Sequence, residues 1–91
     1  MFYAVSYDIV DNRRRHKVSE MLKDYGQRVQ LSVFEVHLEG DDLARLTRRL
    51  TLEMDMETDS LRIYPLCKAC REQIGVIGQG NVTQQPDVII I

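Results

Sequence analysis

The sequence contains few cysteines and no long apolar run, and each shortage excludes a class of protein. Cys67 and Cys70 are too few for the disulfide framework of a small secreted domain. The apolar runs extend over only a few residues, whereas a helix needs roughly 20 apolar residues to cross a bilayer. The first residues contain no basic segment and no cleavage-like stretch, so we expect no signal peptide. Together these absences predict a cytoplasmic protein that does not associate with a membrane.

The chain also lacks the excess of positive charge that is typical of nucleic-acid-binding proteins, because its formal net charge is −2. The charges are, however, unevenly distributed. Residues 12–49 contain nine Lys and Arg against six acidic residues, and residues 50–91 contain three against six. Since binding depends on the local field rather than on the total charge, residues 12–49 permit phosphate binding without proving it.

The hydrophobic pattern predicts a single α+β domain, for which a length of 91 residues is suitable. Segments rich in β-branched and aromatic residues predict four strands, at 2–9, 28–38, 60–66 and 74–78. Apolar residues at helical spacing predict two helices, one from a cap at Asp11 or Asn12 to Gly26 and one that starts at Gly40-Asp41. This order of elements predicts a ferredoxin-like sandwich, in which one antiparallel sheet is covered by two helices on one face.

Two of the predicted strands contain irregular features. Within 28–38 the apolar residues change from odd to even positions, which predicts a bulge or a strand that is buried on both faces. Pro65 is expected to end the strand at 60–66. The glycines after residue 74 do not match a phosphate-binding loop, and they predict a flexible turn at 78–80.

The sheet face without helices requires a cover that a chain of this length does not supply. A second copy is the simplest cover, and the small or polar residues Ala4, Ser6 and Asp8 would let two sheets approach. We divide the chain into a ferredoxin-like domain at 1–80 and a linker with a C-terminal strand at 81–91. That strand is expected either on its own sheet or, as we favour, on the edge of the partner's sheet. Its residues would then add to the dimer interface: Val88, Ile89 and Ile90.

A carboxylate and a run of cations meet where the first strand ends. Asp8 is followed by a capped helix start with five potential cations in a row at 13–17. This arrangement combines a ligand for a hard metal ion with phosphate-binding groups. Helical phase places Arg14 and Arg15 near the inward stripe of the helix, from which they can reach the strand end. The alternative is a solvated helix start with a salt bridge to Asp8 or Asp11.

Four motifs in this chain resemble those of one protein family. They are Tyr7-Asp8-Ile9, Arg15-x-Lys17-Val18, the segment Arg28-Val-Gln-Leu-Ser32-Val33-Phe34-Glu35, and Arg62-Ile-Tyr64-Pro-Leu. Together with the length and the element order, they resemble the CRISPR-associated Cas-two family. This family is also called the CRISPR-associated endoribonuclease, and it is the smaller of the two core proteins of spacer acquisition. The likeness covers nearly the whole chain.

The resemblance implies a ferredoxin-like homodimer whose C-terminal strand crosses to the partner. It also implies that Asp8 is the catalytic and metal-binding aspartate, close to Asp8 of the partner subunit at the dimer axis. Two adjacent carboxylates repel each other unless a cation joins them, and we expect Mg²⁺, with Mn²⁺ as the alternative. Matching positions and helical phase predict the nucleic-acid contacts: Tyr7, Arg14, Arg15, Lys17, Arg28 and Phe34. For Phe34 we favour packing in the core or an interface over stacking on a base, and Tyr7 is similarly divided between burial and contact.

Two functions from different classes agree with this resemblance. In the first, the dimer is an adaptor that bridges copies of the CRISPR integrase, the Cas-one protein, and the DNA to be inserted. In the second, the Asp8 pair is a metal-dependent nuclease site that cuts RNA or DNA. We favour the adaptor. A free-standing, toxin-like ribonuclease and a ligand-binding regulatory module are weaker alternatives.

We discount two further groups of residues as functional signals. Cys67-x-x-Cys70 supplies only two zinc ligands, and the chain has no second such pair, although a dimer would supply four thiolates if both loops met. We expect these cysteines to be structural or incidental. Arg45, Arg48 and Arg49 are expected on a solvated helix face, with contact to a DNA backbone as the alternative.

Overall fold

The computed structural model describes residues 1–83. In chain order its elements are β1 (Phe2–Asp8), α1 (Asn12–Lys23), β2 (Gly26–Gln30), β3 (Val33–His37), α2 (Asp42–Glu53), β4 (Ser60–Leu66) and α3 (Lys68–Arg71). The predicted C-terminal strand lies outside the described residues, as do the interface positions Val88, Ile89 and Ile90. Within residues 1–83, no helix has both the length and the apolar character that crossing a membrane requires.

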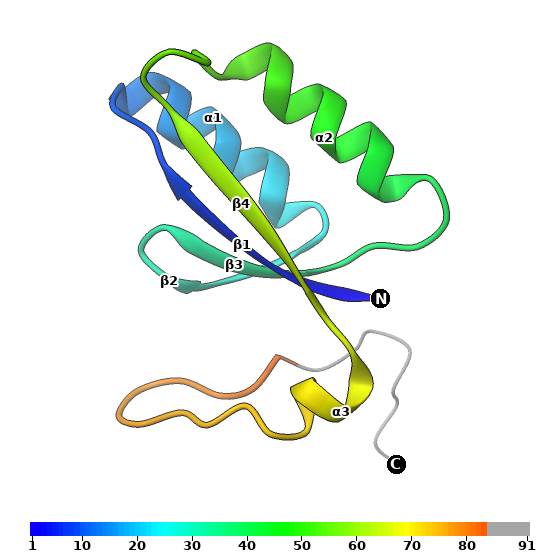
Figure 1. The fold of residues 1–91 in the computed structure, drawn as a ribbon. Coiled ribbons are helices and arrows are strands. Elements are labelled where there is room, and N and C mark those ends of the chain that lie inside the picture. The colour runs from blue at the N-terminus through cyan, green and yellow to red at the C-terminus, as the bar shows by residue number, and fades with distance from the viewer. Residues whose placement is uncertain (84–91) are drawn as a thin grey trace.

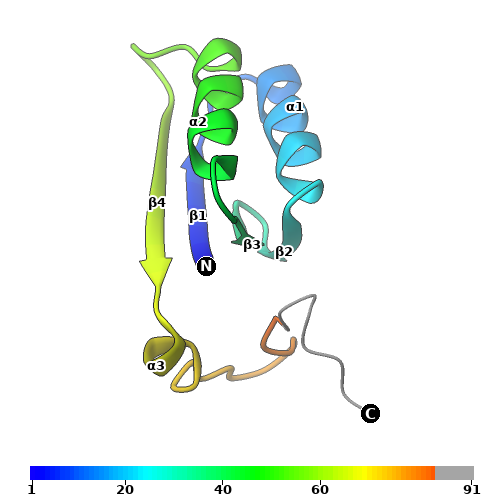
Figure 2. The ribbon, with the colours of Figure 1, turned by 90° about the vertical axis from the view of Figure 1, so that its right-hand side faces the viewer.

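The four strands form one antiparallel sheet in the order β2-β3-β1-β4. Helices α1 and α2 lie together on one side of this sheet, and the chain after β4 turns back on the other side (Figures 1 and 2). The first six elements therefore follow the order β-α-β-β-α-β of a ferredoxin-like sandwich. The predicted α+β fold, with two helices on one face of an antiparallel sheet, is confirmed.

The core lies between the sheet and the two helices. Alternate residues of β1 and β3 face the helices, and each helix supplies its apolar stripe at a spacing of four residues. The side chains with almost no exposed surface come from all of these elements: Val5, Val18, Leu22, Phe34, Val36, Leu46 and Leu50. The N-terminal cap of α1 is Asp11, whose carboxylate accepts a hydrogen bond of 2.9 Å from the backbone N–H of Arg14. The predicted cap is thus present.

The segment 28–38 is a hairpin, so the prediction of one strand there was wrong. The chain reverses at Leu31 and Ser32, between β2 and β3. The register between the two strands shifts between Arg28 and Gln30, which places an irregularity in β2 itself. The change of apolar phase therefore has two sources, a local irregularity and a reversal of the chain, and the sequence pattern does not distinguish them.

The region around β4 differs from the prediction in three ways. Pro65 lies inside β4, opposite Tyr3 of β1, and does not end the strand. Because β4 is at the edge of the sheet, a residue without an N–H is tolerated there. The four-residue helix α3 was not predicted, and the predicted strand at 74–78 is absent. Its Ile77 side chain is fully exposed, because no neighbouring strand in residues 1–83 pairs with this segment.

Candidate metal and nucleic-acid site

Asp8 is the last residue of β1, and its side chain is exposed. Val5 and Tyr7 of β1 are buried towards the helices, so Ala4, Ser6 and Asp8 alternate onto the opposite, helix-free face. Its neighbour across the strand pair is Ser60 of β4. Among residues 1–83, no hydrogen-bond or ion-pair partner of the Asp8 carboxylate is present. Its oxygens therefore remain available to a ligand.

The potential metal ligands of one chain fit a site that two chains share, and they do not fit a site that one chain completes by itself. In the described part of the chain, no three His, Cys, Asp or Glu side chains gather as potential metal ligands. A single chain therefore offers the one exposed carboxylate of Asp8 at this place. Mg²⁺ keeps several water ligands and often binds to only one or two carboxylates, so Asp8 and a second copy of it would suit this ion.

Arg14 forms an ion pair that connects the start of α1 to the start of β4. Its Nε donates to Asp59 Oδ2 at 2.9 Å and its NH2 group to Asp59 Oδ1 at 3.3 Å. The Asp59 side chain has no exposed surface and also accepts from the backbone N–H groups of Val10 and Asp55. The Arg14 guanidinium, together with these N–H donors, holds the pKa of Asp59 well below its usual range. The salt bridge that the sequence allowed is present, but with a different aspartate.

Arg15 holds the loop between β1 and α1. Its Nε donates to the Ile9 carbonyl at 3.1 Å and its NH2 group to the Val10 carbonyl at 3.3 Å. Its NH1 group donates to Asn12 Oδ1. Arg14 and Arg15 thus fix the loop that directly follows Asp8. This positioning role of the two arginines was not foreseen from the sequence.

A pocket of about 310 Å³ lies at the same end of the sheet as Asp8. It brings together three of the predicted nucleic-acid contacts, Tyr7, Arg15 and Arg28. Sequence reasoning had not selected the other residues of its wall: Asn12, His16, Ser19, Leu31 and Ser32. Only two of these residues had a feature in the sequence that could have pointed to the site: His16 belongs to the run of cations at 13–17, and Ser32 belongs to one of the four motifs. Two guanidinium groups beside hydroxyl and amide groups suit a phosphate.

Two predicted contact residues lie elsewhere. The Lys17 Nζ is 3.6 Å from Glu53 Oε1, on the side of α2, and Lys17 does not line the pocket. Phe34 is completely buried, and its ring lies 6.3 Å from that of Tyr7. The Arg28 guanidinium sits 5.4 Å from the centre of the Phe34 ring. In this conformation a base cannot reach Phe34, which supports Arg28 from inside the core.

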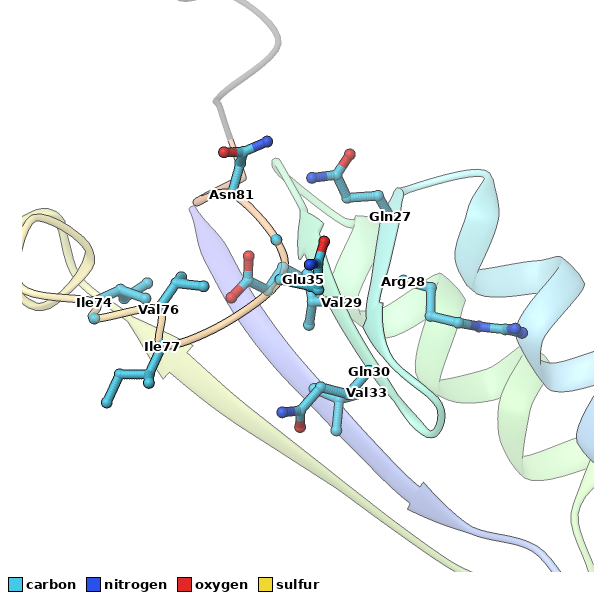
Figure 3. Close-up of a pocket in the computed structure, with 13 residues that line it drawn as sticks. Gln27, Arg28, Val29, Gln30, Val33, Glu35, Ile74, Val76, Ile77 and Asn81 are labelled. Atoms are coloured by element: carbon cyan, nitrogen blue, oxygen red, sulfur yellow. The ribbon is translucent and has the colours of Figure 1, made fainter.

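The segment after α3 covers another part of the helix-free face. Thr83 accepts a hydrogen bond of 2.9 Å from the Gln27 side chain and donates one to the Glu35 carboxylate. Between β2, β3 and residues 74–81 lies a cavity of about 490 Å³, with Gln27, Gln30 and Glu35 on its sheet side (Figure 3). Asp8 is not part of its wall. The end of β1 with Asp8 is therefore left uncovered by residues 74–83.

Comparisons with known proteins agree on one protein family over most of the chain. Residues 1–74 match the family model described as CRISPR associated protein Cas2. CRISPR-associated endoribonuclease Cas2 1 of Chloroflexus aurantiacus is 52% identical over the full length of both chains. CRISPR-associated endonuclease Cas2 2 of Thermus thermophilus is 44% identical, over 98% of this chain and 94% of its own length.

Solved structures agree with these sequence matches. The Cas2 protein of Streptococcus pyogenes superimposes with a TM-score of 0.79 at 35% identity, over 86% of this chain and all of its own. A chain of a partial Cas6-RT-Cas1–Cas2 complex does so with a TM-score of 0.78 at 29% identity, over 99% of this chain and 98% of its own. With the motif around Asp8, the fold and these matches in agreement, the chain belongs to the CRISPR-associated Cas2 family.

Proposed function

We propose that this protein acts in CRISPR adaptation as a cytoplasmic homodimeric adaptor that bridges integrase subunits and DNA. The observation that supports this most directly is the uncovered part of the helix-free sheet face. Along β1, the side chains of Ala4 and Ser6 are small and half-buried, and Asp8 at the strand end is exposed. A second copy that packs against this face would place the two Asp8 side chains close to the dimer axis.

The proposed DNA contact is the pocket between α1 and the β2–β3 turn. Arg15 and Arg28, which carry guanidinium groups, line it together with Tyr7 and Ser32, which carry hydroxyl groups. Such groups bind phosphate oxygens independently of base sequence, which is what an adaptor for varied DNA fragments needs. Arg14 and Lys17 face acidic partners, Asp59 and Glu53, so we assign them mainly to positioning and to the local field.

The proposed integrase partner rests on the comparison with a known assembly. The structure named as a partial Cas6-RT-Cas1–Cas2 complex contains a chain that matches 99% of this one. We therefore propose a Cas1-type integrase as the protein partner. We propose that residues 81–91, a linker followed by a C-terminal strand at 88–91, place this strand on the edge of the partner's sheet.

Nuclease activity is the second candidate function, because relatives are named as an endoribonuclease and as an endonuclease. Asp8 of both subunits would hold Mg²⁺, or alternatively Mn²⁺. The ion would polarise a phosphodiester and lower the pKa of a bound water. Arg15 and Arg28 would bind the backbone at the same end of the sheet, on the face that the helices cover. Within residues 1–83, one chain contributes the single carboxylate of Asp8 at this point, so we rank cleavage of RNA or DNA below the adaptor role.

Substitution of Asp8 by Asn separates the two functions. We expect Asp8→Asn to keep the dimer, measured by light scattering, and to keep spacer acquisition, while any metal-dependent cleavage is lost. Asp41→Asn is the matched control, since Asp41 is exposed and its side chain makes no capping hydrogen bond. Loss of acquisition by an intact Asp8→Asn dimer would contradict the pure adaptor. A monomer that does not bind to duplex DNA would contradict both functions.

A further inference from the structure

Cys67 and Cys70 lie together at the corner where the chain leaves β4. Both side chains are exposed. The Cys67 Sγ accepts a hydrogen bond from the backbone N–H of Cys70 at 3.4 Å, so this sulfur is turned towards the position of the second cysteine. Cys67 is the N-cap residue of α3 and Cys70 lies within the helix, and the two thiols are close enough for a hydrogen bond between them.

The two thiols differ in their acidity. The N–H of Cys70 stabilises a thiolate at Cys67, and this hydrogen bond lowers the pKa of Cys67. The hydrogen bond that the Cys70 thiol donates to the Cys67 sulfur, together with the negative charge of a Cys67 thiolate, raises the pKa of Cys70. The pair therefore has an attacking thiol and a resolving thiol, which is the division of roles found in dithiol exchange.

A metal site at the same place is less well supported. In residues 1–83 no third His, Cys, Asp or Glu joins the two cysteines in a group that could hold a metal ion. The nearest chain neighbours in α3 include Lys68 and Arg71, whose positive charge favours thiolates but supplies no ligand. A chain with two ligands leaves a tetrahedral zinc site half empty.

We propose that Cys67 and Cys70 form a redox-active dithiol that closes to an intramolecular disulfide by exchange with low-molecular-weight disulfides such as oxidised glutathione. The Cys67 thiolate attacks one sulfur of the disulfide, forms a mixed disulfide and releases one glutathione thiolate. Cys70 loses its proton to solvent and attacks the Cys67 sulfur, and the second glutathione thiolate leaves. The chain gives up two protons and two electrons, and the small disulfide is reduced to two thiols.

The position of the pair connects its redox state to the segment beyond it. Arg71 follows Cys70 directly, and its guanidinium lies 3.6 Å from the centre of the Phe2 ring on β1. The same side chain donates a hydrogen bond of 3.2 Å to the Thr83 carbonyl. A disulfide across this turn would restrict the corner from which residues 72–83 return to the sheet. This role is independent of Asp8 and of DNA binding.

The test uses the full chain in buffers with different ratios of reduced and oxidised glutathione, followed by alkylation and mass spectrometry. We expect wild type to lose both free thiols together. The product should carry no glutathione adduct and no covalent link between chains. The matched variants separate the two steps. Cys70→Ser should accumulate one glutathione on Cys67, and Cys67→Ser should react about tenfold more slowly.

Three results would overturn this inference. They are stable glutathione adducts on both cysteines of wild type, a disulfide that joins two chains, and retention of both free thiols under oxidising ratios. A zinc site would instead be indicated if wild type retained added zinc and the bound zinc protected its thiols from alkylation. Neither Ser variant should then retain zinc. Since both side chains are exposed, the Ser variants are expected to fold, which circular dichroism checks.

Discussion

At the scale of single residues, the two consecutive arginines of α1 fix the same loop from two directions. Arg15 binds the carbonyl groups of Ile9 and Val10, and Arg14 binds Asp59, which in turn accepts from the Val10 N–H. Because this loop follows Asp8 directly, these contacts determine where the Asp8 side chain leaves the sheet. A loss of activity on substitution of either arginine would therefore include a loss of position.

The Asp59 carboxylate predicts how stability depends on pH. Its pKa is lowered in the folded protein, so its contribution is complete above the unfolded-state pKa of about 3.9 and is lost as the pH falls below that value. We expect the free energy of unfolding of wild type to decrease between about pH 5 and about pH 2. The Asp59→Asn variant should be less stable at neutral pH and should decrease less steeply on acidification. Urea unfolding at several pH values measures both.

The control for this prediction lies in the same turn. Asp55 is exposed, and its carboxylate accepts from the backbone N–H of Glu57 but forms no ion pair with Arg14. Asp55→Asn should keep most of the acid dependence of wild type. If the free energy of unfolding fell equally steeply with pH for wild type and Asp59→Asn, the Arg14–Asp59 pair would not control acid stability.

At the scale of elements, the β2–β3 hairpin places Arg28 beside the pocket, and one glycine allows its close pairing. Gly26 lies opposite Val36. A Cβ atom at Gly26 would contact the Glu35 carbonyl oxygen and would lie 2.6 Å from the Val36 Cα, closer than real Cβ contacts. The two strands can therefore reach this separation only if residue 26 has no side chain.

We expect Gly26→Ala to cost about 1–3 kcal/mol of unfolding free energy, because β2 must move away from β3. The matched control is Gly75→Ala, since a Cβ atom there would meet no atom within 4 Å. That change should stay within about 0.5 kcal/mol. Urea unfolding of both variants makes the comparison, and equal stabilities would show that β2 shifts without cost.

At the scale of the whole molecule, regular patterns were predictable and long-range choices were not. Period-two and helical spacing predicted β1, α1, α2 and β4, because each element buries one face in the same core. The reversal at Leu31 and Ser32 was missed, since a hairpin and an irregular strand produce the same change of phase. The ion pair between Arg14 and Asp59 was missed because the two residues are distant in sequence and meet only when β4 pairs with β1.

The same distinction applies to the site. The sequence singled out Asp8 through its motif, and it named Tyr7, Arg15 and Arg28, which the fold gathers in one pocket. It also named Phe34 and favoured packing for it, and the side chain is buried in the core.

If the pocket binds DNA in the proposed dimer, substitution of Arg28 should weaken this binding. The Arg28 side chain is exposed, so Arg28→Ala should leave the fold within about 1 kcal/mol of wild type. It should weaken duplex binding for all sequences alike and lower the slope of log affinity against log salt by about one per subunit, because one phosphate contact is lost. Arg45→Ala is the control, as Arg45 lies on α2 and pairs with Asp42 at 3.1 Å. Fluorescence anisotropy at several salt concentrations gives both slopes. If Arg45→Ala alone lowered the slope, the DNA would run along α2 and not past the pocket.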